Sequence, residues 1–191
     1  MAIFERAIPT VLLHEGKLVD DKQDRGGITN YGISLQFLLR TGDLDKDGVP
    51  DGDVNLDGSV NAEDIRKLTK EQAVRLYKLY FWDKNNYEKI ADDLVATKIL
   101  DLAVNMGSYQ AHRIAQRAVR AVVNIILDED GLMGLKTLTA INMCRPDRLL
   151  VALKAEASCF YRLLIAKNPV MEKYRDGWLA RAYSSPILDI G

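Results

Sequence analysis

The segment from Glu15 to Ile33 constrains the fold most, because an apolar helical pattern gives way there to a polar loop. Before it, Ile3 to His14 places its apolar residues on one face of a helix. Glu15 and Gly16 end that pattern, and residues 17–33 carry Gly, Asp and Asn at close spacing. This composition predicts a loop or a short hairpin. The chain is therefore expected to have a small β element near its N-terminus.

Most of the remaining chain has helical patterns with recognisable ends. Thr69 and Gln72 form a capping box before an apolar run. An amphipathic pattern from Asp92 to Met106 is stopped by Gly107, a residue that commonly ends helices. Pro146 stands at the first turn of a long helix that continues to about residue 166. We therefore predict a mainly α protein (α+β) with a helical C-terminal half.

Bulk properties exclude several classes of partner. A formal net charge of -1 gives no reason to expect a nucleic-acid partner. No window approaches the ~18 apolar residues of a membrane span. Cys144 and Cys159 lie in helical patterns rich in Leu and Ala, which favours buried thiols over a disulfide. The first residues lack the pattern of a Sec signal peptide, so we expect synthesis in the cytoplasm and another route of export. A monomer is expected.

An acidic insert at residues 43–64 contains a repeat of ten residues. In its second copy, oxygen-bearing side chains fall at loop positions 1, 3, 5, 9 and 12, with Gly58 at position 6 and a backbone carbonyl at position 7. The predicted ligands of this second loop are Asp53, Asn55, Asp57, Ser59, Asn61 and Asp64. This spacing indicates a structural Ca²⁺ site, and it resembles dockerin-type calcium loops. The alternative interpretation is a solvated acidic turn.

The first copy of the repeat fits the calcium pattern less well. Its candidate ligands are Asp43, Asp45, Asp47 and Asp51. Val54 holds its twelfth position, so binding of one or of two ions stays open. This copy resembles the Asp-rich repeats of thrombospondin type 3. A docking surface for a protein partner is the alternative role of the insert.

Glu15 is the candidate general acid. A carboxylate at a helix C-terminus meets the negative end of the helix dipole, and partial burial disfavours its charge further. Both effects favour a protonated acid near neutral pH. Asp24 follows nine residues later and Thr29 five residues after that. A pair of carboxylates is what cleavage of a glycosidic bond requires. An ordinary exposed glutamate is the alternative interpretation.

These residues resemble the active-site motif of phage-type lysozymes, and more closely that of glycoside hydrolase family 108. That family includes muramidases of phage endolysins and bacterial secretion activator proteins. The resemblance rests on Glu15-Gly16 and on all of residues 24–33, and it departs at Lys17, where the family usually has Gly. Further stretches resemble the family in order, and they are residues 81–83, 87–90, 101–107, 130–138 and 176–181.

The resemblance implies an N-acetylmuramidase that cleaves the β-1,4 bond between N-acetylmuramic acid and N-acetylglucosamine in peptidoglycan, without a catalytic cofactor. Glu15 would protonate the leaving oxygen, Asp24 would stabilise the sugar cation or activate water, and Thr29 would hold that water. Asp20 competes for the second carboxylate role, and Asp24 has the alternative role of capping the Gly26-Gly27 loop. The implied substrate-binding residues are Asn30, Tyr31, Asn105, Tyr109 and Gln116. For the last three, helix packing and capping is an equal alternative.

The resemblance also sets expectations for organisation and location. Residues 1–90 would form the catalytic region, with the insert at 43–64, and residues 91–191 a helical peptidoglycan-binding region. The protein would act in the periplasm or cell wall after holin-type release or dedicated export. Two rival functions remain: a non-catalytic peptidoglycan-binding or secretion accessory protein that keeps the fold, and a calcium-dependent adaptor.

Overall fold

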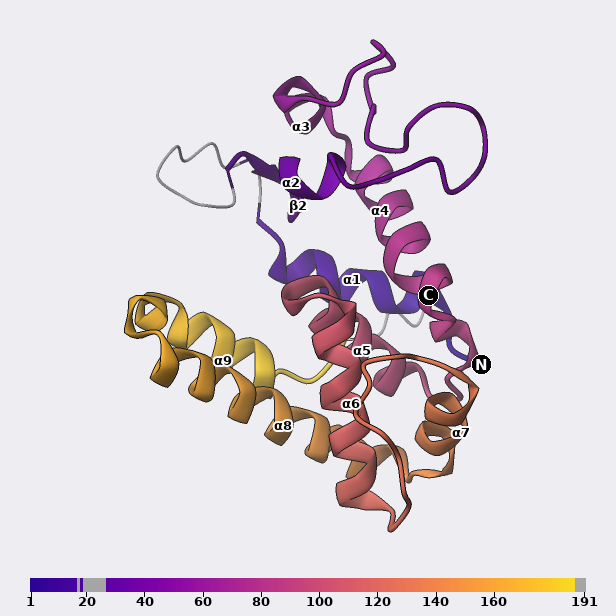
Figure 1. The fold of residues 1–191 in the computed structure, drawn as a ribbon, viewed down its shortest axis with the longest axis vertical. Coiled ribbons are helices and arrows are strands. Elements are labelled where there is room, and N and C mark those ends of the chain that lie inside the picture. The colour runs from indigo at the N-terminus through magenta and orange to yellow at the C-terminus, as the bar shows by residue number, and fades with distance from the viewer. Residues whose placement is uncertain (17, 19–26, 188–191) are drawn as a thin grey trace. The chain divides into compact units, whose positions relative to one another are not determined.

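The computed structural model describes residues 1–16, 18 and 27–187, and it is mainly α-helical (Figure 1). The α-helices are α1 Phe4–His14, α2 Leu35–Leu38, α3 Ala62–Lys67, α4 Lys70–Tyr77, α5 Asp93–Met106, α6 Ser108–Val122, α7 Leu135–Met143, α8 Pro146–Lys167 and α9 Arg175–Tyr183. Strands β1 (Thr29–Asn30) and β2 (Ile33–Ser34) form a two-stranded antiparallel sheet. The predicted fold class, mainly α with a small β element near the N-terminus, is confirmed. Within these described residues, no helix has the length and apolar character needed to cross a membrane.

The chain divides into two compact units. The helical unit comprises residues 1–11 and 81–191, and the hairpin unit comprises residues 12–80. The assignment of catalysis to residues 1–90 and of wall binding to residues 91–191 stays a prediction.

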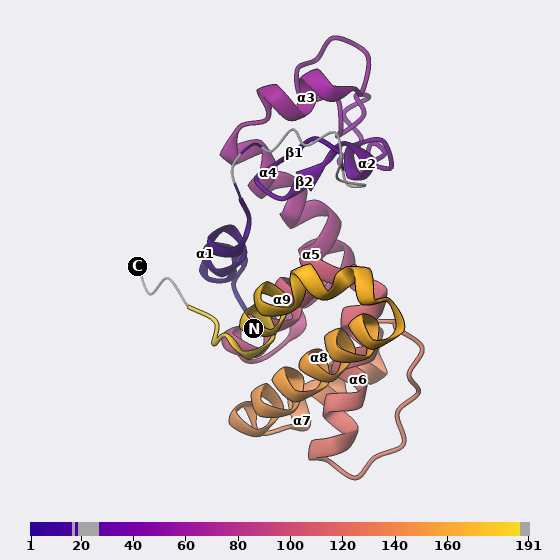
Figure 2. The same ribbon diagram turned by 90° about the vertical axis from the view of Figure 1, so that its left-hand side faces the viewer.

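The helical unit is built around α5, whose residues 95–103 are all buried. Asp92 accepts a hydrogen bond from the backbone N–H of Val95, and Gly107 ends the helix with a positive φ of 86°. Both predicted ends of this helix are therefore confirmed. Figure 2 shows α6 and α8 side by side, with α9 next to α8. These packed faces bury the apolar side chains that the amphipathic patterns predict.

A buried ionic cluster links α5 to α9 inside the helical unit. Arg181 donates to the Oδ1 atom of Asp101 at 3.0 Å, and both side chains are buried. The Lys98 ammonium, 1% exposed, donates to the carbonyl oxygens of Arg181 and Ser184 at 2.6 and 3.2 Å. Burial lowers the pKa of Lys98 to about 8, although the nearby Asp101 charge opposes this. The cluster holds the C-terminal helix in place at an electrostatic cost.

The hairpin unit contains the short sheet and helices α2 to α4. Thr29 pairs with Ser34 and Asn30 with Ile33, so Tyr31 and Gly32 form a two-residue turn. Their φ angles are 48° and 74°, and positive φ at both central positions defines the hairpin turn that matches strand twist. The predicted short hairpin is confirmed for residues 29–34.

The turn between α3 and α4 fixes the position of the hairpin. The buried Asn30 side chain donates to the carbonyl oxygens of Ile65 and Leu68 at 3.1 and 3.2 Å. Thr69 and Gln72 exchange the two hydrogen bonds of the predicted capping box, at 3.2 and 2.9 Å. Helix α4 therefore starts at a fixed point beside the strand that carries the hairpin turn.

Candidate functional site

Glu15 and the hairpin turn form the candidate acid site. Glu15 directly follows α1 and is half-buried. A Cβ atom placed on Gly32 would lie 2.0 Å from the Glu15 Oε2 atom and 2.6 Å from the Tyr77 hydroxyl oxygen. The carboxylate and the phenol therefore meet in a space that exists only because residue 32 has no side chain.

Tyr77 anchors the same turn from the last residue of α4. Its hydroxyl donates to the carbonyl oxygen of Tyr31 at 2.7 Å, and its side chain is almost fully buried. A tyrosine with φ of 48° is strained, and this hydrogen bond holds the strained peptide in place. The end of α1, the turn and the end of α4 thus converge on one carboxylate.

The other predicted catalytic residues are placed in part. Thr29 is half-buried in β1, one residue before the buried Asn30. Tyr31 is half-buried in the turn. Asp24 and the competing Asp20 lie outside the described residues, as does Lys17. The structure brings together Glu15 and the turn of the motif, and the roles of the two aspartates stay predictions.

The candidates from the C-terminal half differ in what their side chains do. Gln116 is fully buried and donates to Asp130 Oδ1 at 2.7 Å while accepting from the Gly131 N–H at 2.9 Å. Asn105 accepts a 2.6 Å hydrogen bond from the Tyr161 hydroxyl. These contacts agree with the alternative of helix packing and capping, and a role of Asn105 and Gln116 in substrate binding stays a prediction. Tyr109 is 60% exposed, and its ring lies against Gly131 with the Arg113 guanidinium 5.8 Å from the ring centroid.

The same pattern of hydrogen bonds between an aspartate and the backbone occurs twice in the Asp-rich insert. Asp43 accepts from the N–H groups of Asp47 and Gly48 at 3.1 and 3.0 Å. Ten residues later, Asp53 accepts from the N–H groups of Asp57 and Gly58 at 3.1 and 2.8 Å. The two glycines have φ angles of 90° and 89°, which only glycine adopts easily. The sequence repeat is thus also a repeat of local structure.

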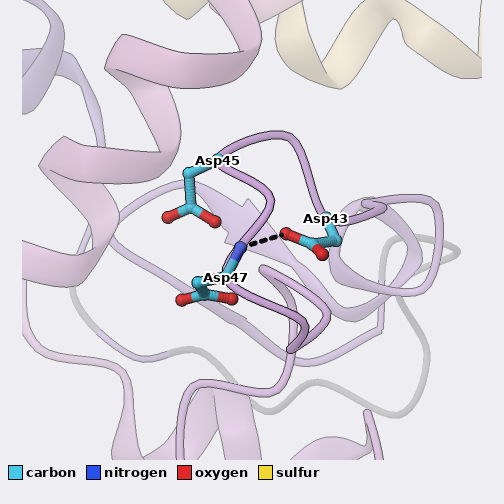
Figure 3. Close-up of side chains that lie close together, drawn as sticks. All are labelled: Asp43, Asp45 and Asp47. Atoms are coloured by element: carbon cyan, nitrogen blue, oxygen red, sulfur yellow. Dashed lines mark hydrogen bonds between the residues drawn. The ribbon is translucent and has the colours of Figure 1, made fainter.

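The first loop groups three carboxylates but is partly neutralised by an arginine. One oxygen each from Asp43, Asp45 and Asp47 lie within 4.8 Å of one another, and all three residues are exposed (Figure 3). Arg75 forms ion pairs with Asp45 and with Asp51, the latter at 3.2 Å. Asp51 also accepts from the Tyr80 hydroxyl at 2.8 Å. A cation in this loop would compete with the Arg75 guanidinium.

The second loop is closed by a buried carboxylate from α3. Asp64 is fully buried and accepts from the N–H groups of Asn55 and Asn61 at 3.3 and 2.7 Å. Asp53 is also buried, whereas Asp57 is exposed and accepts from Ser59 at 2.8 Å. Carboxylate and amide oxygens are the ligands that a hard cation such as Ca²⁺ prefers. Among the described residues, however, the group of three carboxylates whose oxygens lie within 4.8 Å of one another is that of the first loop.

Sequence reasoning missed Gly32 and Tyr77 as members of the acid site. A glycine at the second position of a two-residue turn is a hairpin signal, so a contribution of Gly32 to the turn was detectable. Tyr77 lies in an apolar helical run, where a tyrosine is usually a core residue. No local pattern distinguishes it from its neighbours.

Comparisons with known proteins identify the class of this protein. The sequence model of the Glycosyl hydrolase 108 family matches residues 8–107, and that of the Predicted Peptidoglycan domain matches residues 110–183. These matches define a glycosyl hydrolase region followed by a peptidoglycan domain. The first match covers more than half of the chain, and the protein belongs to the Glycosyl hydrolase 108 family.

A solved structure supports this assignment over nearly the whole chain. The structure of SagA from Brucella abortus shares 26% sequence identity with this protein and has a TM-score of 0.64. The alignment covers 95% of this chain and 97% of that chain. No curated protein sequence matches this one significantly. Peptidoglycan is therefore supported as the partner, and glycoside hydrolysis as the general class of activity.

Proposed function

We propose that the protein is a peptidoglycan hydrolase that cleaves the β-1,4 bond between N-acetylmuramic acid and N-acetylglucosamine. Family membership supports glycoside hydrolysis, and the peptidoglycan domain supports the polymer on which it acts. The structural observation that carries the proposal is the position of the Glu15 carboxylate, in the space that a side chain at Gly32 would fill.

In this reaction Glu15 donates its proton to the glycosidic oxygen as the bond from that oxygen to the anomeric carbon breaks. The leaving sugar departs as an alcohol, and positive charge develops on the other ring. Asp24, or Asp20 in its place, stabilises that charge or activates the water that ends the reaction. Thr29 holds the water, while Tyr31 lines the cleft. No cofactor takes part in the chemistry.

Replacement of Glu15 by glutamine tests the proposal. Glutamine keeps the size of the side chain but has no proton of suitable acidity to donate. We expect the Glu15→Gln protein to fold normally and to lose at least a hundredfold in the release of reducing ends from purified cell walls. The matched control is Glu5→Gln, an exposed carboxylate in the first turn of α1, which should keep full activity.

The products identify the bond. Mass spectrometry of the released muropeptides should show N-acetylmuramic acid at the reducing end. Hydrolysis by Glu15→Gln at the parental rate would show that Glu15 is not the acid. Wall binding by the parent protein without any release of reducing ends would favour a non-catalytic accessory protein that keeps the fold. We propose that the protein acts on the wall as a monomer, after holin-type release or dedicated export.

We also propose that the second Asp-rich loop binds a structural Ca²⁺ ion. The repeated backbone arrangement and the two buried carboxylates Asp53 and Asp64 support this proposal. The insert has few apolar residues of its own, so a bound ion would supply much of its order. At a calcium concentration a hundred times the Kd, binding would raise the free energy of unfolding by about 2.7 kcal/mol.

Calorimetric titration with calcium chloride tests this site directly. Asp57→Asn removes one charged ligand and should weaken binding about tenfold, because fewer charged ligands lower calcium affinity. Glu63→Gln is the control, since Glu63 is exposed and pairs with Arg66 of its own helix. A parent protein that binds no calcium at millimolar concentration would refute the proposal. Calcium-dependent capture of a partner without hydrolysis would favour the adaptor.

A further inference from the structure

A groove with basic walls lies between α6 and α8 of the helical unit, in the region that matches the peptidoglycan domain. Its volume is about 490 Å³, within the range of small-ligand sites. We call it the arginine groove, and the lining residues that matter here are Arg113, Arg117, Glu156, Phe160, Leu164 and Lys167. The two helices pack against each other, and Figure 2 shows α8 next to α6.

Positive charge exceeds negative charge at this groove. Arg113, Arg117 and Arg120 follow one another at helical spacing on α6, and all three pair with the single carboxylate of Glu129. Arg117 also donates to Glu156 at 2.9 Å. Desolvation would raise the pKa of Glu129, but the charges of Arg117 and Arg113 lower it, so Glu129 stays ionised. At the groove itself, Arg113, Arg117 and Lys167 carry three positive charges, against the two carboxylates of Glu129 and Glu156.

The groove retains donor capacity beside an apolar surface. The Arg113 Nε atom is buried and has no hydrogen-bond partner among the residues that the structure describes. Phe160 and Leu164 are half-buried and give the groove an apolar side. Lys167, at the C-terminal end of α8, is exposed and adds an ammonium group. A ligand for this site should combine carboxylates with short alkyl groups.

We propose that the arginine groove binds the stem peptide of peptidoglycan through its free carboxylates. This inference rests on the proposed function for its choice of polymer. The amino-sugar strand itself is uncharged where muramic acid is amidated, whereas the attached short peptide carries carboxylates and methyl groups. Guanidinium groups match carboxylates in geometry as well as in charge. The groove therefore distinguishes peptide-bearing strands from bare glycan.

Binding of small probes to the full chain tests the inference without any hydrolysis. The probes are N-acetylmuramoyl-tripeptide with free carboxylates, the same compound with its carboxylates amidated, and chitobiose. We expect the free-carboxylate probe to bind at least about tenfold more tightly than its amidated form, as loss of one charge-assisted hydrogen bond implies. Equal binding of the two muramoyl probes would overturn the inference, whatever the variants do.

The variants locate the site. Arg113→Gln and Lys167→Gln should each weaken binding of the free-carboxylate probe at least about fivefold, with little change for chitobiose. Arg120→Gln is the matched control, because Arg120 pairs with the same Glu129 but does not line the groove. Unchanged thermal unfolding of each variant excludes a general loss of structure. An equal effect of Arg113→Gln and Arg120→Gln would overturn the assignment to this groove.

The hydrolase proposal and the arginine-groove proposal can be refuted independently of each other. Release of reducing ends from walls, with no preference for free carboxylates in the binding assay, would leave the hydrolase proposal intact and overturn this one. Carboxylate-dependent binding at the groove, with no hydrolysis of walls, would support this inference and overturn the proposed activity.

Discussion

Replacing Gly32 with alanine tests whether the position of the Glu15 carboxylate controls the rate of hydrolysis, independently of the stability of the fold. The added Cβ would lie 2.0 Å from the Glu15 Oε2 atom, far inside van der Waals contact. It would also lie 2.6 Å from the hydroxyl of Tyr77, which is buried and cannot move easily. The Glu15 carboxylate ends a side chain with several rotatable bonds, so it is the group that yields. We expect it to move by an ångström or more.

The magnitude of each effect follows from this geometry. An alanine at the Gly32 φ of 74° costs about 1–2 kcal/mol in backbone strain. A displacement of about 1 Å of a catalytic group can lower the rate about a hundredfold. Gly32→Ala should therefore lose at least about 1–2 kcal/mol of unfolding free energy, because the close contact with the Tyr77 hydroxyl adds to the strain, and should hydrolyse purified walls about a hundredfold more slowly. Urea unfolding and the release of reducing ends measure the two quantities independently.

Gly48→Ala provides the matched control. Gly48 has a φ of 90°, and no atom of the described residues lies within 4 Å of a Cβ placed on it. This variant should show a backbone strain similar to that of Gly32→Ala but keep nearly full activity. The reasoning would be refuted if Gly32→Ala hydrolysed walls at the parental rate, or if Gly48→Ala lost as much activity as Gly32→Ala.

Two further perturbations test the hydrogen bonds and charges around these sites. Tyr77→Phe removes the donor to the Tyr31 carbonyl, so it should cost about 1–2 kcal/mol in unfolding free energy and lower kcat more than it raises KM. The folded pKa of Lys98, about 8, lies below the ordinary lysine value of 10.5, so the unfolded chain binds more protons between these pH values. From pH 8 to pH 10.5, the unfolding free energy of the parent should therefore rise by about 3 kcal/mol relative to Lys98→Met, as measured in urea. Parallel pH curves for the parent and Lys98→Met would contradict the assignment, as would an unchanged kcat in Tyr77→Phe.

The helix ends were predictable because their signals are local. Asp92 caps α5 through its own side chain, and Gly107 ends it through its backbone conformation. The Thr69 capping box likewise needs residues only three positions apart. Each of these features depends on a few neighbouring residues, so the sequence alone carries the information.

The arginine groove was not predictable for the opposite reason. Arginines at positions 113, 117 and 120 look like an ordinary solvated helix face. Their shared partner, Glu129, lies in the segment after α6, and Glu156 comes from α8. Only the folded chain brings these groups together, because the pairs link residues up to 39 positions apart. The excess of positive charge appears only when the pairs are counted in the structure.

The position of the Glu15 carboxylate depends on the backbone conformation of the hairpin turn, which the pattern of polar and apolar residues in the sequence does not reveal. A two-residue turn requires positive φ at both central positions, and here one of them is a tyrosine. The strain at Tyr31 is tolerated because its carbonyl accepts the Tyr77 hydrogen bond, and Gly32 leaves room for the Glu15 carboxylate. The same turn thus closes the hairpin and holds the proposed acid. Tyr31→Gly would relieve this strain but would also increase the conformational freedom of the unfolded chain, so the two effects on the unfolding free energy should largely offset each other. The release of reducing ends should nevertheless fall, because a more flexible peptide fixes the Tyr77 hydroxyl and the Glu15 carboxylate less firmly, and an unchanged rate would contradict this role of the turn.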